Sequence, residues 1–181
     1  EKVIQYYRNE TGLKVADLGT GSGAILVGFL YYCRDAVGVG VDISTEALKI
    51  AEENGQNLKI TDRVEWRQGD YLKAFDEEDI FDGIFSNPPY IPTKDIGGLS
   101  REVKHEPRLA LHGGTDGLYF YHLLAKGAAE HLKPGGFLAV EFGIGQATDI
   151  LEMFRKSAQY EDFEVIKDYG GIERALYCRK K

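Results

Sequence analysis

The sequence predicts an α/β fold in which a mostly parallel sheet carries helices on both faces and ends in antiparallel strands. The first observation is that short apolar strands alternate with helical segments along the 181 residues, a pattern typical of parallel sheets. The second is a glycine-rich turn at residues 19–23 that joins the first strand to an apolar helix. The third is Asn87-Pro88-Pro89-Tyr90, where two prolines force the chain out of a buried strand because each lacks an N–H.

The predicted elements are bounded by residues that start or stop them. Ser44 is a good N-cap, and Glu46 lies in the first turn of the following helix, where it complements the helix dipole. Residues 134–136, Pro-Gly-Gly, should stop a helix, and Gly170-Gly171 should form the turn between the last two strands. In chain order, we expect the end of a helix within residues 1–12, strands at 14–18, 36–41, 63–68, 80–86 and 137–142, helices at 24–33, 45–57, 116–132 and 146–158, and closing strands at 163–167 and 175–179.

The segment 91–115 is the exception, because it has no clear apolar period. Two glycine pairs, Gly97-Gly98 and Gly113-Gly114, interrupt it. A loop of this length inside a compact domain is usually functional or mobile, and we expect one or the other here.

Length and charge limit the classes of function. The chain is long enough for one good core, so we expect a single domain over residues 1–181. The net charge of −7 and the pI of about 5.2 argue against a broad nucleic-acid-binding face, since such faces are basic. The longest apolar run, 24–32, is too short to span a bilayer, and there is no signal-peptide pattern. We therefore expect a cytoplasmic protein without a membrane partner.

The cysteines and histidines call for neither a disulfide nor a metal site. Cys33 and Cys178 each lie in an apolar segment, so buried free thiols in a reducing compartment are favoured over a disulfide. The histidines have no metal-ligand spacing with cysteine or with one another; they are His105, His112, His122 and His131.

The glycine-rich turn differs from a dinucleotide-binding fingerprint. Its glycines allow a tight turn and let a ligand approach the backbone closely. Gly23 follows Gly21 by two residues, however, where the fingerprint needs three. The turn also follows an acid, Asp17, and contains no lysine. These features suit a ligand that has a positive charge and no phosphate.

Acidic residues follow the next two strands as well. Asp42 ends the second strand, where a carboxylate can bind both hydroxyls of a ribose. Asp70-Tyr71 follows the third strand and can offer a polar contact and an aromatic face to a base. A glycine turn alone is often structural, and a lone aspartate after a strand is often a helix cap. Their occurrence in order at successive strand ends favours a ligand site, and the ligand that fits is S-adenosylmethionine, contacted by Gly19, Thr20, Gly21, Ser22, Gly23, Asp42 and Tyr71.

The tetrapeptide at 87–90 suits methyl transfer to a planar NH₂ group. The enzyme must place the nucleophile on the axis of the S–CH₃ bond, and positioning can supply much of the rate. The Asn87 side-chain oxygen and the rigid Pro88 carbonyl can accept hydrogen bonds from the NH₂ group, and Tyr90 can stack on it. No strong general base is required, because the proton can leave during or after transfer. The alternative is a plain loop after a strand, which the upstream cofactor motif disfavours.

The chain resembles the bacterial release-factor glutamine methyltransferases, the HemK/PrmC family of class I methyltransferases. Asn-Pro-Pro-Tyr alone is also found in adenine-N6 methyltransferases, so the more specific resemblance lies downstream, in 106–118. The resemblance covers almost the whole chain and rests on 16–24, Asp42, 86–91, Glu106-Pro107-Arg108-Leu109-Ala110-Leu111, Gly113-Gly114, Asp116-Gly117-Leu118, Glu141, Gly143, Gln146, 168–171 and Arg174.

This resemblance implies a class I, Rossmann-like fold with a seven-stranded sheet, S-adenosylmethionine as cofactor, and the glutamine of the Gly-Gly-Gln loop of peptide-chain release factors as methyl acceptor. It implies that residues 19–23 and Asp42 hold the cofactor and that Tyr71 flanks its adenine. Asn87 would contact both cofactor and substrate, and the glutamine pocket would consist of Pro88, Pro89 and Tyr90. Members of the family usually carry an amino-terminal helical domain and a Pro-Arg-x-x-Thr-Glu element before the glycine turn, and neither is present here. We therefore expect the catalytic domain of a longer protein.

The residues are also compatible with two other functions. An adenine-N6 methyltransferase of DNA or RNA would use the same planar-amine chemistry, although the acidic balance and the block 106–118 favour a protein substrate. A binding module that has lost activity is the other alternative, and an intact 87–90 argues against it. The residues that could meet a phosphate backbone are Lys94, Arg101, Lys104 and Arg108, but loop charges are more often simply solvated.

Overall fold

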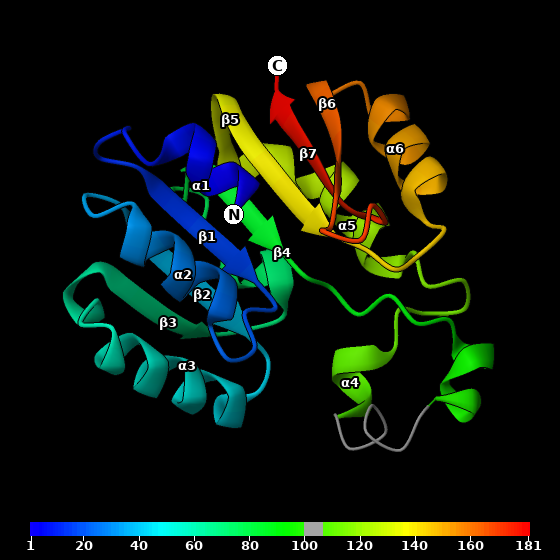
Figure 1. The fold of residues 1–181 in the computed structure, drawn as a ribbon, viewed down its shortest axis with the longest axis horizontal. Coiled ribbons are helices and arrows are strands. Elements are labelled where there is room, and N and C mark those ends of the chain that lie inside the picture. Colours follow the sequence, from blue (N-terminus) through cyan, green and yellow to red (C-terminus); the bar gives the residue numbers. More distant parts are fainter. Residues whose placement is uncertain (100–106) are drawn as a thin grey trace.

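The computed structural model describes residues 1–99 and 107–181, which form one seven-stranded sheet flanked by helices (Figure 1). The strands are β1 (Lys14–Leu18), β2 (Val37–Asp42), β3 (Val64–Gln68), β4 (Phe81–Ser86), β5 (Leu132–Glu141), β6 (Tyr160–Lys167) and β7 (Glu173–Lys180). Their order across the sheet is β3-β2-β1-β4-β5-β7-β6. The first five strands run parallel, whereas β7 runs antiparallel to both β5 and β6. The predicted α/β sheet with an antiparallel carboxyl-terminal end is confirmed.

Helices cover both faces of this sheet. They are α1 (Lys2–Tyr7), α2 (Ala24–Tyr32), α3 (Thr45–Asn57), α5 (Tyr119–Gly127) and α6 (Ala147–Lys156). The short helix α4 (Arg108–Leu111) lies in a lobe away from the sheet (Figure 1). Successive residues of a strand point to opposite faces, so Val15 packs in a cluster with α1 and α2, whereas Ala16 packs in one with α5 and α6. Figure 1 shows α2 and α3 beside the β2–β3 half of the sheet and α6 beside β6 and β7.

The strand order reverses between β1 and β4. From β1 the chain moves outward to β2 and β3, and it then returns to the other side of β1 with β4. At the end of β1, Leu18 pairs with Val41 of β2 and with Ser86 of β4. The turn at 19–23 and the tetrapeptide at 87–90 therefore leave the sheet side by side, at the edge where ligands of open α/β sheets bind.

The predicted helix 116–132 is wrong at its start. Helix α5 begins at Tyr119, because the Asp116 side chain accepts a hydrogen bond from the Leu118 backbone N–H at 2.9 Å and holds a turn there. Gly117 has a φ of +80°, a left-handed conformation that an α-helix cannot continue. The end is also wrong, since a 3₁₀ turn replaces the last helical turn, over Ala128–His131.

Strand β5 begins five residues earlier than predicted, at Leu132 instead of 137. Leu132 pairs with Phe81 at the start of β4, and the register shifts before Phe137 pairs with Gly83. The Pro-Gly-Gly segment at 134–136 is thus an irregularity within a strand, a place that tolerates proline. The other predicted strands and helices occur with small shifts at their ends, and Cys33 and Cys178 are buried and free, as predicted.

The segment predicted to lack regular structure contains some. Ile91 forms a parallel bridge with His112, and short helices occupy Thr93–Gly98 and Arg108–Leu111. These pieces are too short to give an apolar period in the sequence. The predicted basic residues Arg101 and Lys104, together with Glu106, lie outside the described residues.

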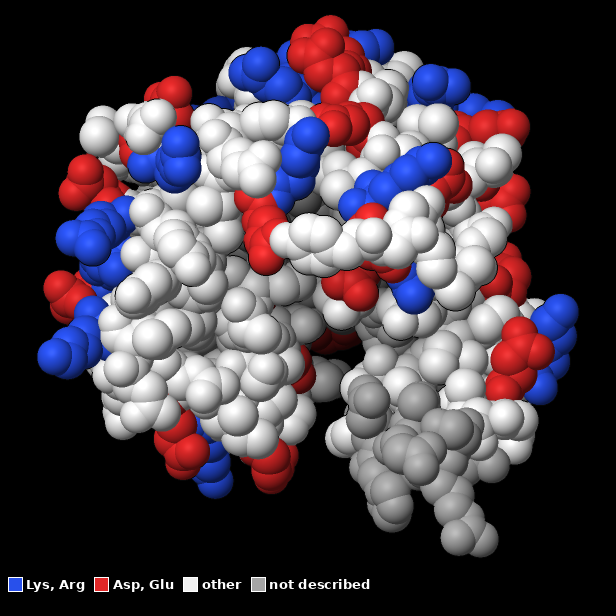
Figure 2. All heavy atoms as spheres, in the orientation of Figure 1, with Lys and Arg blue, Asp and Glu red and all other residues white. Residues whose placement is uncertain are grey.

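Two surface properties bear on function. In the ranges that the structure describes, no helix is long and apolar enough to cross a membrane. On the face shown in Figure 2, the described Lys and Arg side chains are interspersed with Asp and Glu, so the described part of this face carries no extended basic patch. The same view shows the molecule hollowed between the half that carries α2 and α3 and the lobe that contains α4.

Candidate active site

The glycine turn after β1 is a tight loop built on left-handed glycines. Gly19, Gly21 and Gly23 have φ values of +69°, +56° and +77°, which other residues adopt only with strain. The Thr20 backbone N–H donates to the Val41 carbonyl at 2.9 Å, which ties the turn to the end of β2. A Cβ on Gly23 would lie 2.9 Å from the Trp66 ring, so glycine is needed there for close packing as well. The loop is therefore rigid and presents backbone to the crevice.

Asp42 fixes this loop from the neighbouring strand. One carboxylate oxygen accepts from the Gly21 backbone N–H at 2.8 Å, and the other accepts from the Ser44 N–H at 2.9 Å. Ser44 in turn caps α3, as predicted, by accepting from the Ala47 N–H. A carboxylate offers about four acceptor positions, so Asp42 retains capacity for ligand hydroxyls while it holds the loop.

Asp17 is a buried acid at the root of the same loop. It is 1% exposed, and its Oδ2 accepts from the Thr20 hydroxyl at 2.7 Å. Its Oδ1 is buried and has no hydrogen-bond partner among the described residues. Burial raises the pKa of Asp17 to about 7. An unpaired buried acceptor is costly unless something binds it, so this oxygen suits a donor or a cation on a ligand.

Tyr71 covers the glycine loop from the β3 side. Its φ of +52° is unusual for a tyrosine, and its ring stacks on Phe120 with centroids 4.5 Å apart. The hydroxyl lies 2.8 Å from the position that a Cβ on Gly19 would take. Like Asp17 Oδ1, this hydroxyl is buried without a described partner, and burial raises the pKa of Tyr71. A ligand that approaches the Gly19 backbone therefore meets Tyr71.

The tetrapeptide at 87–90 begins directly beside this loop. Ser86 is buried, and its hydroxyl donates to the Leu18 carbonyl at 2.8 Å, which joins the ends of β4 and β1. The Asn87 side chain is exposed and makes no hydrogen bond within the described ranges, so its amide is free for a ligand. Pro88 is buried and Tyr90 is half-buried. The structure thus brings together the predicted site residues of both motifs.

Sequence reasoning missed the segment that supports the tetrapeptide. Ile91 donates to the Leu111 carbonyl at 3.0 Å and accepts from the Gly113 N–H at 2.9 Å. The Thr93 N–H and hydroxyl both donate to the Gly114 carbonyl, at 2.9 and 3.0 Å. The glycine-rich block at 113–117 was visible in the sequence, but only the structure shows that it underlies the acceptor loop.

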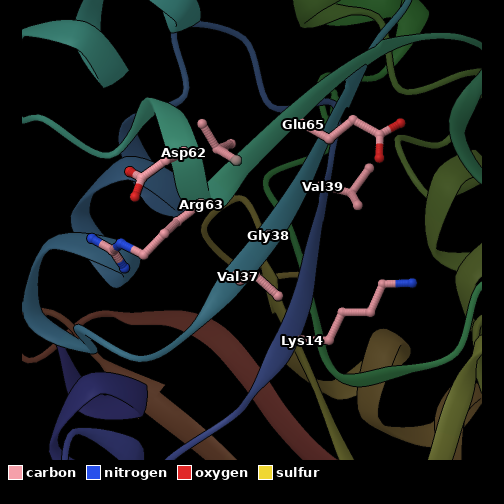
Figure 3. Close-up of a pocket in the computed structure, with 8 residues that line it drawn as sticks. Lys14, Val37, Gly38, Val39, Asp62, Arg63 and Glu65 are labelled. Atoms are coloured by element: carbon pink, nitrogen blue, oxygen red, sulfur yellow. The ribbon is translucent and has the colours of Figure 1, made fainter.

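A second hollow lies at the opposite edge of the sheet and does not belong to this site (Figure 3). It measures about 260 Å³, and its lining includes Lys14, Val37 and Val64, the first residues of β1, β2 and β3. The Arg63 guanidinium at its edge donates to the carbonyls of Leu30 and Ala36, where it caps the end of α2. The Arg63 guanidinium is therefore engaged in hydrogen bonds that stabilise the fold.

The sequence matches the model of a family described as "Methyltransferase domain" over residues 9–141. A release factor glutamine methyltransferase of Moorella thermoacetica is 41% identical over 92% of this chain and 59% of the relative. One of Bradyrhizobium diazoefficiens is 43% identical over 99% of this chain and 61% of the relative. The chain thus spans about three fifths of the length of these curated relatives.

Solved methyltransferase structures share the fold at lower identity. A methyltransferase from Pyrococcus furiosus superimposes with a TM-score of 0.70 and 22% identity over 98% of this chain and 79% of that one. An RNA methyltransferase from Salinibacter ruber, in complex with S-adenosyl-L-homocysteine, superimposes with a TM-score of 0.60. It is 18% identical, over 99% of this chain and 88% of that one. At these identities the likeness supports the architecture alone.

Proposed function

Because the chain belongs to the methyltransferase domain family, we propose that it transfers the methyl group of S-adenosylmethionine to the side-chain nitrogen N5 of a glutamine. The acceptor is the glutamine of the Gly-Gly-Gln motif of peptide-chain release factors. The observation that carries the chemistry is the position of Asn87, which follows the Leu18–Ser86 strand pair directly and so adjoins the glycine loop. The names of relatives that are 41% and 43% identical carry the choice of substrate.

The residues around the glycine loop fit the cofactor. Two buried polar atoms there, Asp17 Oδ1 and the Tyr71 hydroxyl, have no partner among the described residues. Asp17 would hold the ammonium group of the cofactor, Asp42 the ribose hydroxyls, and Tyr71 the adenine, above the turn at 19–23. When bound, the cofactor supplies an electrophilic methyl group on a sulfonium.

The tetrapeptide would hold the acceptor. The exposed Asn87 side-chain oxygen and the Pro88 carbonyl accept hydrogen bonds from the glutamine NH₂ group and orient its nitrogen toward the methyl group. The fixed φ of each proline limits the movement of this backbone, and the Tyr90 ring closes the side of the pocket. Orientation of this kind accelerates a displacement without a strong base, and the proton leaves to water during or after transfer.

Charge supports a protein substrate over a nucleic acid. The net charge is −7, and acidic and basic groups alternate on the face seen in Figure 2. Nucleic-acid binding draws most of its affinity from contacts between basic side chains and phosphates. Adenine-N6 transfer is therefore the outcome that a test must exclude.

The test compares methyl acceptors with the full-length protein and methyl-labelled S-adenosylmethionine. Equal concentrations of a release factor, its Gly-Gly-Gln variant with the glutamine replaced by alanine, DNA and RNA are offered separately. We expect label in the unaltered release factor alone. Label in DNA or RNA, or equal label in both release factors, would contradict the proposal.

A further inference from the structure

The Gln146 side chain binds three separate stretches of backbone at the active-site edge. Its Nε2 donates to the Tyr90 carbonyl at 3.1 Å and to the Gly117 carbonyl at 3.3 Å. Its Oε1 accepts from the Gly143 backbone N–H at 2.9 Å. One amide thereby joins the loop after β4, the segment before α5 and the loop after β5, and it spends both its donors and an acceptor lone pair on them.

Glycines let these stretches approach one another closely. A Cβ on Gly117 would lie 2.4 Å from the Tyr90 carbonyl oxygen and 2.8 Å from Gln146 Nε2. A Cβ on Gly143 would lie 2.9 Å from the Tyr90 ring and 3.0 Å from Gln146 Oε1. A Cβ on Gly113 would lie 2.7 Å from the Pro89 carbonyl oxygen. The backbone around Tyr90 is therefore enclosed on several sides, with Gln146 as its polar contact.

The Tyr90 carbonyl and the Ile91 N–H belong to one planar peptide unit, which hydrogen bonds hold from both sides. Before it, Pro88 and Pro89 have ring-fixed φ angles. After it, Ile91 is paired on both its N–H and its carbonyl with 111–113. Among the described residues, the Tyr90 carbonyl has Gln146 Nε2 as its hydrogen-bond partner. The direction of this peptide, and with it the placement of the Tyr90 ring, therefore depends on Gln146 together with the Leu111 carbonyl, to which the Ile91 N–H donates.

We propose that Gln146 is a positioning residue for the acceptor site. It acts through the Tyr90 backbone and touches neither cofactor nor substrate, so it should affect the rate of methyl transfer more than cofactor binding. This inference rests on the proposed function, because it assigns Gln146 to the pocket in which the glutamine NH₂ group is held. Misplacement of a reacting group by about 1 Å costs on the order of 100-fold in rate.

The chain offers a matched control in Gln159. This residue is also half-buried, and its Nε2 likewise donates to two backbone carbonyls, those of Ala125 and Lys126, at 3.4 and 3.3 Å. It joins the end of α5 to the segment before β6, away from the acceptor loop. Substitution by methionine at either position keeps the side-chain volume and removes the amide.

The experiment compares Gln146→Met and Gln159→Met in the full-length protein, with the unaltered protein as reference. We expect Gln146→Met to lower kcat at least tenfold while the dissociation constant for S-adenosylmethionine changes less than threefold. Gln159→Met should leave both within twofold. A kcat for Gln146→Met within twofold of the reference, or equal losses of kcat in both variants, would overturn the inference.

Amide hydrogen exchange provides a readout that does not depend on activity. Exchange of the Gly143 and Ile91 amides should accelerate at least tenfold in Gln146→Met and stay unchanged in Gln159→Met; unchanged exchange in Gln146→Met would contradict the inference. A reference protein that methylates nucleic acid would refute the proposed function alone, and the kcat comparison would then be made with that acceptor. A reference protein that methylates the release factor, with Gln146→Met equally fast, would refute the Gln146 inference alone.

Discussion

The cofactor half and the acceptor half of the site are held together in different ways. In the cofactor half, the turn at 19–23 is fixed by Asp42, whose carboxylate binds the loop from the next strand in the chain. In the acceptor half, the loop after β4 is fixed by the amide of Gln146, some sixty residues away, and by the segment 111–117. The first half is local and anchored by charged groups, whereas the second is non-local and anchored by neutral hydrogen bonds and close glycine contacts. Substitutions in the two halves should therefore affect different measured quantities.

The largest effect is expected at the acceptor itself. Asn87→Ala should lower kcat by about 100-fold or more, because it removes the hydrogen-bond acceptor that we propose orients the nucleophile. The thermal unfolding midpoint should stay unchanged, since the Asn87 side chain is exposed and makes no hydrogen bond in the described part of the chain. Steady-state kinetics and a thermal scan measure the two quantities. Near-normal turnover would remove Asn87 from the mechanism.

Gly117→Ala should damage the acceptor half through packing. The new Cβ would lie 2.4 Å from the Tyr90 carbonyl oxygen, at a residue whose φ is +80°. We expect a loss of about 1–3 kcal/mol in the free energy of unfolding and a kcat about tenfold lower, with cofactor affinity retained. Gly98→Ala is the control, because a Cβ there meets no heavy atom of the described residues within 4 Å. Equal behaviour of the two variants in chemical denaturation and kinetics would mean that the close contact has no role.

Asp42→Ala tests the cofactor half of the site. It leaves the Gly21 and Ser44 backbone N–H groups without their acceptor, which costs about 1–3 kcal/mol in unfolding free energy. It should also weaken cofactor binding about tenfold, while kcat at saturating cofactor falls little. Isothermal titration gives the dissociation constant, and an unchanged value would refute the ribose assignment.

The last prediction is a pH dependence that arises from Asp17. Its pKa of about 7 in the folded protein exceeds the ordinary value, so the folded state binds more protons than the unfolded state between about pH 4 and pH 7. Relative to Asp17→Asn, the unfolding free energy of the unaltered protein should therefore fall as pH rises through this window and level off above it. The asparagine retains an acceptor for the Thr20 hydroxyl.

The same titration should act on the cofactor in the opposite direction. In the proposed site the ionised carboxylate would attract the ammonium group of the cofactor, so the dissociation constant of the cofactor should decrease severalfold as pH rises through 7. This change should be absent in Asp17→Asn. Titrations at several pH values measure both proteins, and parallel curves would show that Asp17 does not bind the ammonium group.

The difference between the halves also explains what the sequence could predict. The Ser44 cap follows from a short spacing and is confirmed. Asp42 ends the second strand, where the sequence placed it, but its hydrogen bond to the Gly21 N–H was not predicted. The tetrapeptide at 87–90 could be located because two prolines end a strand.

The contacts that hold the tetrapeptide in place could not be predicted from short sequence spacings. Gln146 and the glycines at 113–117 are distant from Tyr90 in sequence, and no sequence pattern indicates that they contact it. The start of β5 was misplaced because proline and glycine within a strand irregularity look like a helix stop. The contact of Tyr71 with Gly19 depends on a left-handed φ at Tyr71, which nothing in its neighbours signals.

The most direct test of the central claim is to locate the methyl group on the acceptor. A release factor is incubated with the full-length protein and S-adenosylmethionine, and the peptide that contains Gly-Gly-Gln is sequenced by mass spectrometry. We expect one added methyl group, on the side-chain nitrogen of that glutamine, and none with Asn87→Ala. If nucleic acid is added and its adenine is methylated while the glutamine stays unmodified, the proposed function is contradicted.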